Sequence, residues 1–255
     1  MNKSNAHMNP TLIMQGGVLL GLLTLVHLLY EGVVRPAASA LVATQGASAT
    51  NAIWVVLKDY EQQLCITIGL YCCFLMAYKV FRLLSEETFY SMDFLSNHPK
   101  DEPLDLNKAL TELEGSEFKD NSAISTWINC IQRFKNTGNV QHASDAISSS
   151  TESLAMQLEA GNSMIRYCIW AIPSIGFVGT VRGIGEALAR AEQAVSGDIS
   201  GMVDKLGVAF NSTLVSLLVS LVLMFFMHLL NNRQDQMVIN TQASCERHLL
   251  AHLHK

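Results

Sequence analysis

Four apolar segments set the first limit on what this chain can fold into. They run from Leu12 to Val34, from Leu64 to Leu84, from Ile165 to Leu188 and from Leu206 to Leu230. Each is long enough for a membrane-spanning helix, which needs about 20 residues. Only 15% of the 255 residues are charged, whereas a soluble domain has about 25%. The sequence therefore predicts an all-α, polytopic membrane protein with four transmembrane helices and a cytoplasmic helical module.

Residues 1–84 are expected to hold two transmembrane helices joined by a long periplasmic loop. This loop is rich in Ala, Ser and Thr and ends in "IWVVLKDY", which suits a short interfacial helix with Trp54 at the lipid headgroups. The start of the chain also resembles a cleavable signal peptide, with Lys3, an apolar run and Ala-Ser-Ala at 38–40. The apolar run is long, however, and it contains His27 and Glu31. We therefore expect the first span to be retained.

Residues 85–164 are expected to form the cytoplasmic module. "SEETFYSMDFLS" predicts a helix that "NHPKDEP" ends. A second helix, which begins after Ser122 and ends near Gly138, has one apolar face made of Ile124, Trp127, Ile128, Ile131 and Phe134. From Val140 onward we expect one helix, unbroken before Pro173, that rises from the cytoplasm into the membrane.

The placement of Lys and Arg predicts the orientation. Basic residues are frequent in 85–164 and recur in the tail 231–255, and positively charged loops stay in the cytoplasm. Lys79 and Arg82 at the end of the second span are expected to anchor it at the cytoplasmic surface. Both termini are therefore predicted to be cytoplasmic, with residues 165–230 as a transmembrane hairpin.

Other candidate residues are few. His27 lies in a span, where an ionisable residue is a functional candidate, although a neutral imidazole bonded to a neighbouring helix is an alternative. The six cysteines include no C-x-x-C pair, and His248 and His252 have metal spacing but no acid or cysteine in register. No Walker loop, G-x-S-x-G, H-E-x-x-H or dinucleotide motif occurs, and the net charge is −5 without a basic run. We expect no metal, cofactor, nucleic-acid partner or enzyme activity.

The third span contains the unusual stretch "PSIGFVGTVRGIGEA", which begins at Pro173. Helical spacing places on one face Pro173, Gly176, Thr180, Gly183 and Ala187. Gly179 and Gly183 also form a G-x-x-x-G, and small residues let transmembrane helices approach closely. We expect these glycines and Pro173 to pack helices, together with Ala209 of the fourth span.

The fourth span carries a matching polar stripe, made of Ala209, Ser212, Thr213, Ser216 and Ser220. Such hydroxyls can simply bond to carbonyls of their own helix. Depth suggests more, because Thr180 precedes Arg190 by ten residues and Thr213 follows Asp204 by nine. At 1.5 Å per residue, both threonines lie about 14 Å from the outer boundary. An antiparallel hairpin would place them side by side, as a polar track for a small ion requires.

These residues resemble a known family. "PSIGFVGTVRGI" matches the Pro-x-x-Gly-x-x-Gly-Thr-Val-x-Gly-Ile pattern of the MotA/TolQ/ExbB proton-channel family, and "FNSTLVSL" is similar to its last span. The resemblance implies a homopentameric ring in the bacterial inner membrane, around a single-span partner of the ExbD, TolR or MotB kind that carries the essential aspartate. It also implies that Thr180 and Thr213 line the ion path, to which we add Ser212 and Ser216 from the polar stripe.

Two positions depart from the family pattern. Val208 stands where members often have a glutamate, and Arg182 stands at a commonly apolar position, where we expect it to pair with Glu186 one turn on. The expected function is a proton or sodium channel subunit that converts the ion-motive force into work, whether for uptake, envelope maintenance, motility or defence. The alternative is a non-conducting membrane scaffold, in which the small-residue stripes only pack helices.

Overall fold

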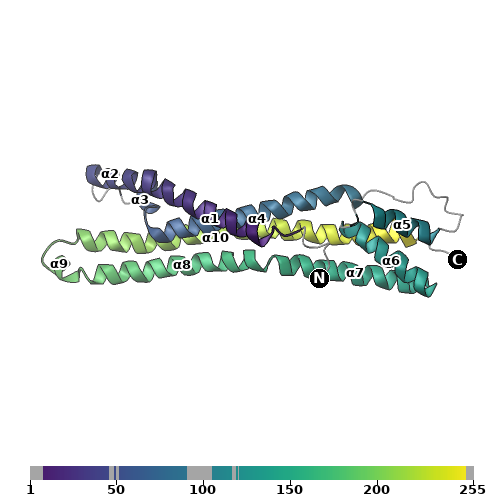
Figure 1. Ribbon diagram of the computed structural model, residues 1–255. Coiled ribbons are helices and arrows are strands. Elements are labelled where there is room, and N and C mark those ends of the chain that lie inside the picture. Colours follow the sequence, from purple (N-terminus) through teal and green to yellow (C-terminus); the bar gives the residue numbers. More distant parts are fainter. Residues whose placement is uncertain are drawn as a thin grey trace. The chain divides into compact units, whose positions relative to one another are not determined.

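Helices make up every regular element of the described chain, which comprises residues 8–45, 49, 52–90, 105–116, 119 and 121–250 of a computed structural model (Figure 1). Four stretches within these residues are long and apolar enough to cross a membrane: Leu12–Gln45, Tyr60–Glu86, Val140–Leu188 and Ser200–Leu249. The predicted all-α class with four candidate spans is confirmed.

The chain divides into two compact units, which are described separately. The span unit comprises residues 11–76 and 164–227. The module unit comprises residues 1–10, 77–163 and 228–255. Two long helices, α4 (Tyr60–Tyr90) and α10 (Ser200–Ser244), contribute residues to both units.

The first helix of the span unit runs further than expected. It comprises α1 (Leu12–Leu29), a π-helical turn over Tyr30–Val34 and α2 (Arg35–Gln45). Pro36 has no N–H, and its ring crowds the carbonyl one turn earlier. The π-helical turn, in which the Arg35 N–H bonds to the Tyr30 carbonyl, accommodates this break in the hydrogen-bond pattern. The first part of the Ala-rich segment expected to be a loop is therefore helical, since alanine favours helix.

The expected short helix before the second span is present as α3 (Ile53–Val56). It is followed by α4, which begins at Tyr60 rather than at the predicted Leu64. Its Gly69 lies against α10, because a Cβ at this position would come within 2.9 Å of the Val219 side chain. This helix therefore packs closely on α10 within the span unit.

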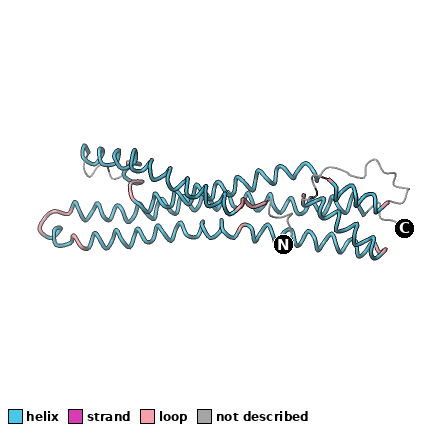
Figure 2. Tube along the Cα trace, viewed as in Figure 1, coloured by secondary structure: helices cyan, strands magenta, loops and turns pink. Residues whose placement is uncertain are grey.

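The remaining spans form an antiparallel hairpin in the span unit. It comprises α8 (Ser163–Leu188), the short α9 (Ala191–Val195) and the span-unit part of α10, as the helix trace in Figure 2 shows. Gly197, with φ 108°, adopts a backbone conformation in the connection that other residues rarely tolerate. Pro173 lies inside α8 without ending it.

Three helices with capped starts lie entirely within the module unit. They are α5 (Leu106–Gly115), α6 (Ser122–Thr137) and α7 (Val140–Gly161), and the side chains of Asp105, Asn121 and Asn139 accept hydrogen bonds from their first turns. Gly138, with φ 60°, ends α6 where the sequence predicts. The predicted apolar face of α6 is also confirmed, with Trp127 and Ile131 fully buried.

The end of the chain contributes to the core of this unit. A π-helical turn over Cys245–Leu249 follows α10. Its first and last residues complete a buried cluster of Leu110, Trp127, Cys130, Ile131, Ala143, Ile147, Cys245 and Leu249. Residues 231–250 are thus an integral part of the module unit, whereas the sequence suggested a separate tail.

The expectation of one helix unbroken from Val140 to Pro173 is wrong at Asn162. This residue is 1% exposed, and its side-chain amide donates to Asn231 Oδ1 at 3.1 Å and to Gln234 Oε1 at 2.6 Å. The preceding Gly161 is a poor helix former. The turn between α7 and α8 therefore follows from a polar contact with α10 that helix periodicity does not reveal.

Lys79 is likewise not the surface anchor that its position suggested. It is only 3% exposed, and its ammonium donates to Asn9 Oδ1. A Cβ at Gly161 would lie 3.1 Å from Lys79 Nζ, so a glycine there leaves room for this contact. The predicted helix 85–96 is described only to Tyr90, and "NHPKDEP" and His252 lie outside the described residues.

We predict that Leu249→Ala destabilises the module unit. Leu249 is fully buried in the core cluster, so the substitution should lower the free energy of unfolding by about 2–5 kcal/mol. Limited proteolysis of the detergent-extracted protein across a temperature series measures the change. The matched control is Ile239→Ala on α10, which is 62% exposed and should change stability by less than about 0.5 kcal/mol. Equal effects of the two substitutions would contradict the proposed packing.

Candidate functional site

Three glycines mark the closest approach of α8 to α10. A Cβ on any of them would lie nearer than 3.0 Å to an atom of α10, which real side chains essentially never do. A Cβ placed on Gly176 would lie 2.7 Å from Ser216 Cβ, and one on Gly179 would lie 2.6 Å from Ser212 Cβ. A Cβ placed on Gly183 would lie 2.8 Å from the backbone nitrogen of Ala209. We call these six residues the glycine seam. The structure thus brings the predicted packing residues of both stripes together, and Pro173 lies on α8 one turn before Gly176.

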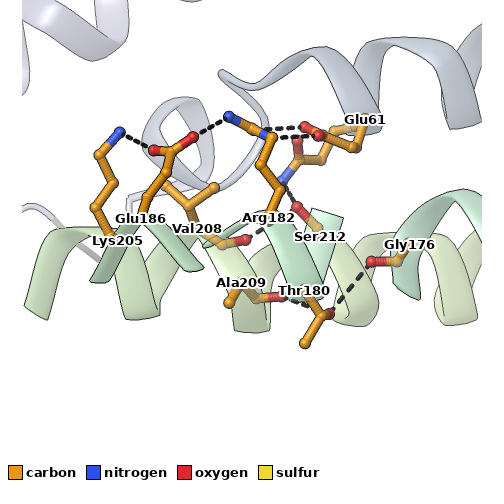
Figure 3. Close-up of polar contacts among 10 residues, drawn as sticks. Glu61, Gly176, Thr180, Arg182, Glu186, Lys205, Val208, Ala209 and Ser212 are labelled. Atoms are coloured by element: carbon orange, nitrogen blue, oxygen red, sulfur yellow. Dashed lines mark hydrogen bonds and ion pairs between the residues drawn. The ribbon is translucent and has the colours of Figure 1, made fainter. Parts of the chain in front are cut away.

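The two candidate threonines meet at this seam. Thr180 Oγ1 is hydrogen-bonded to Thr213 Oγ1. The same Thr180 oxygen lies 3.1 Å from the Ala209 carbonyl and 3.2 Å from the Gly176 carbonyl (Figure 3). Both threonines are half-buried. Four oxygen atoms from two helices therefore converge, and only the two hydroxyls among them carry protons to donate. Such a group can contribute oxygen ligands to a cation or accept a proton donor.

The two candidate serines have different surroundings from the threonines. Ser212 and Ser216 are 1% and 0% exposed and pack against the glycines. The Ser212 hydroxyl donates to the Val208 carbonyl at 2.9 Å, and the Ser216 hydroxyl donates to the Thr213 carbonyl at 3.0 Å. Both hydroxyls therefore donate to their own helix, as the alternative interpretation of the stripe expects, while Ser212 Oγ also accepts a hydrogen bond from Gln62 Nε2 of α4 at 3.4 Å. That these two serines line the ion path stays a prediction.

Arg182 takes part in an ion-pair network that sequence reasoning found only in part. The predicted pair with Glu186 is present at 2.8 Å, and Lys205 pairs with the same carboxylate at 2.6 Å. In addition, Arg182 donates to both carboxylate oxygens of Glu61, at 2.8 and 2.9 Å (Figure 3). Glu61 lies before Leu64, where the sequence predicts the start of the second span, but α4 begins at Tyr60 and includes it. The network joins α4, α8 and α10.

Glu61 also contacts the glycine seam directly. Its side chain is 12% exposed, and its Cγ would lie 3.0 Å from a Cβ at Gly179. The network has no net charge, because the two acids Glu61 and Glu186 are matched by the two bases Arg182 and Lys205. Because a bidentate guanidinium–carboxylate pair has fixed geometry, this network restrains α8 against α4 close to the threonine pair.

His27 has a partner on a neighbouring helix. Its Nδ1 lies 3.2 Å from Gln63 Nε2, while Gln63 Oε1 accepts a hydrogen bond from Arg35 at 3.0 Å. The Arg35 contact fixes the orientation of the amide, so the His27 Nδ1 acts as the acceptor. This arrangement corresponds to the bonded alternative for His27. Among the described residues, no group of three His, Cys, Asp or Glu side chains could hold a metal ion.

We predict that reversing the charge of Arg182 is more damaging than removing it. Arg182→Glu places a third acid beside Glu61 and Glu186, whereas Arg182→Ala only leaves them without this partner. Protein retained in the membrane and its thermal stability in detergent provide the measurement. The control is the double exchange Glu61→Arg, Arg182→Glu, which restores one opposite-charge pair and should recover part of the loss. Equal tolerance of the Ala and Glu variants would show that the network is unimportant.

Comparison with known proteins supports the resemblance seen in the sequence. Residues 119–243 match the model of the MotA/TolQ/ExbB proton channel family, which is a channel family rather than an enzyme family. The matched residues include α6, α7, α8 and most of α10, and so both threonines and the whole glycine seam. No curated protein and no solved structure matches the chain. Residues 119–243 therefore belong to the MotA/TolQ/ExbB proton channel family.

Proposed function

We propose that this chain is the ring-forming subunit of a channel complex that converts an ion-motive force into mechanical work on a partner. The family match supports a role of the proton-channel type. The observation that carries the finer proposal is the contact of Thr180 with Thr213. In the proposed complex, five copies form the ring and the paired hydroxyls of each copy line the ion path.

The chemistry of the pair agrees with this role. Two hydroxyls and two carbonyls supply oxygen atoms but no negative charge, so they can stabilise a passing proton or sodium ion without trapping it. The charge-carrying group would be the carboxylate of a single-span partner, placed at the half-buried face of the threonine pair. Each charge that crosses releases about 2.3 kcal/mol per 100 mV of membrane potential.

The proposed topology follows the distribution of charge. We place the protein in the bacterial inner membrane, with both termini and residues 85–164 in the cytoplasm. The connection between α8 and α10 then faces the periplasm. In this orientation the threonine pair lies near the middle of the bilayer, about 14 Å from the outer boundary.

The second candidate is a non-conducting scaffold. It is favoured by the packing of every glycine in the seam and by the bonds of Ser212 and Ser216 to their own helix. These residues would be needed for a packed hairpin whether or not ions pass. The half-buried threonine pair is therefore where the two functions make different predictions.

We predict that Thr180→Val and Thr213→Val assemble normally but lose ion-driven activity. Valine keeps the shape of threonine, and hydrogen bonds between membrane helices contribute only about 0.6 kcal/mol on average, so the ring should still form. In an ion path, a loss of a couple of kcal/mol in stabilisation of the ion would slow passage about thirtyfold. Native gels report assembly, and ion flux in vesicles that also contain the single-span partner reports activity.

The matched control is Ser174→Ala. This serine lies on α8, is exposed, and bonds to the Trp170 carbonyl of its own helix at 3.2 Å, so its loss should leave both assembly and flux unchanged. Normal flux in the Thr180→Val, Thr213→Val double variant would reject the ion path and favour the scaffold.

A further inference from the structure

The proline in α8 leaves one carbonyl group without its usual partner. In an α-helix, the N–H of residue 173 would bond to the carbonyl of Ile169, but proline has no N–H. The proline ring also crowds this carbonyl and tilts it away from the helix axis. An unsatisfied carbonyl is costly inside a membrane, where no water replaces the lost bond.

A serine of α10 supplies the missing donor. The Ser220 hydroxyl donates to the Ile169 carbonyl at 3.2 Å, and Ser220 is 2% exposed. The other two serines of the stripe, Ser212 and Ser216, bond to carbonyls of α10 itself. Ser220 thus differs from its neighbours in bonding across the hairpin.

The position of this bond relates it to the threonine pair. Thr180 follows Ile169 by eleven residues, and Ser220 follows Thr213 by seven. Because α8 and α10 are antiparallel, the two contacts follow one another along the same hairpin, about 10 Å apart along α10. A slide of one helix along the other would therefore break both contacts together.

We propose that Ser220 is a positioning residue, which replaces the hydrogen bond lost at Pro173 and so fixes the register of α8 against α10 that brings Thr180 to Thr213. The consequence for ion passage rests on the proposed function of the threonine pair. The effect of Ser220 on the register of the two helices does not depend on that function. The effect on register and the effect on ion passage can therefore be tested separately.

The register is tested by cross-linking. Cysteines are introduced at both threonines (Thr180→Cys, Thr213→Cys), copper phenanthroline oxidises the membrane-embedded protein, and mass spectrometry identifies and quantifies the disulfide between the two positions. This measurement is made with Ser220 intact and in the Ser220→Ala and Ser220→Thr backgrounds. We expect Ser220→Ala to lower the rate of cross-linking about threefold, equivalent to the average of about 0.6 kcal/mol for a hydrogen bond between membrane helices. Ser220→Thr, which keeps the hydroxyl, should preserve the rate.

A second pair of variants tests the link to the proline. Pro173→Ala restores an N–H that can bond to the Ile169 carbonyl, so the Ser220 hydroxyl should no longer be needed. Cross-linking in Pro173→Ala, Ser220→Ala should therefore match that in Pro173→Ala alone. An equal loss on removing Ser220 with and without Pro173 would show that the serine only fills space, and would overturn the proposal. So would unchanged cross-linking in Ser220→Ala.

Ion flux is then measured in the same Ser220 variants without the introduced cysteines. Slower flux in Ser220→Ala, with rescue in Ser220→Thr, would extend the positioning role to ion passage. Normal flux in Ser220→Ala together with reduced cross-linking would leave the register role intact and instead count against the ion path at the threonine pair.

Discussion

The close approach of α8 to α10 is the constraint on which the rest of the span unit depends. Backbone and short side chains of α10 occupy the space where a side chain at Gly176, Gly179 or Gly183 would stand. Only at this separation can hydroxyls as short as those of Thr180 and Thr213 reach each other and the facing carbonyls. In lipid, apolar burial does not hold helices together, so van der Waals packing of this kind has to do so.

The features that repeat locally along the chain could be predicted from the sequence. The four spans follow from apolar length and the buried face of α6 from its periodicity. The meeting of Thr180 with Thr213 follows from their nearly equal distances to the turn of an antiparallel hairpin. The pairing of Arg182 with Glu186 followed from spacing on one helix. Each of these needs only local geometry and a single helix–helix arrangement.

The features that depend on distant partners could not be predicted. Glu61 meets Arg182 across 121 positions of the chain, and Asn162 meets Asn231 across 69. Helix periodicity does not indicate the partner of Glu61 or of Asn162. The turn at Asn162 could therefore not be predicted. The hydroxyl stripe of α10 shows the same limit, because Ser212 and Ser220 share a face but bond to carbonyls of different helices.

The burial of Lys79 has a consequence for the order of synthesis and insertion. Its ammonium is held by Asn9, which leaves the ribosome long before α4, while Gly161, the residue that leaves space for this contact, is made much later. When the second span enters the bilayer, an acceptor for the charged group already exists. The partner of the buried lysine is thus synthesised before α4 itself, whereas the glycine that leaves space for their contact follows only with α7.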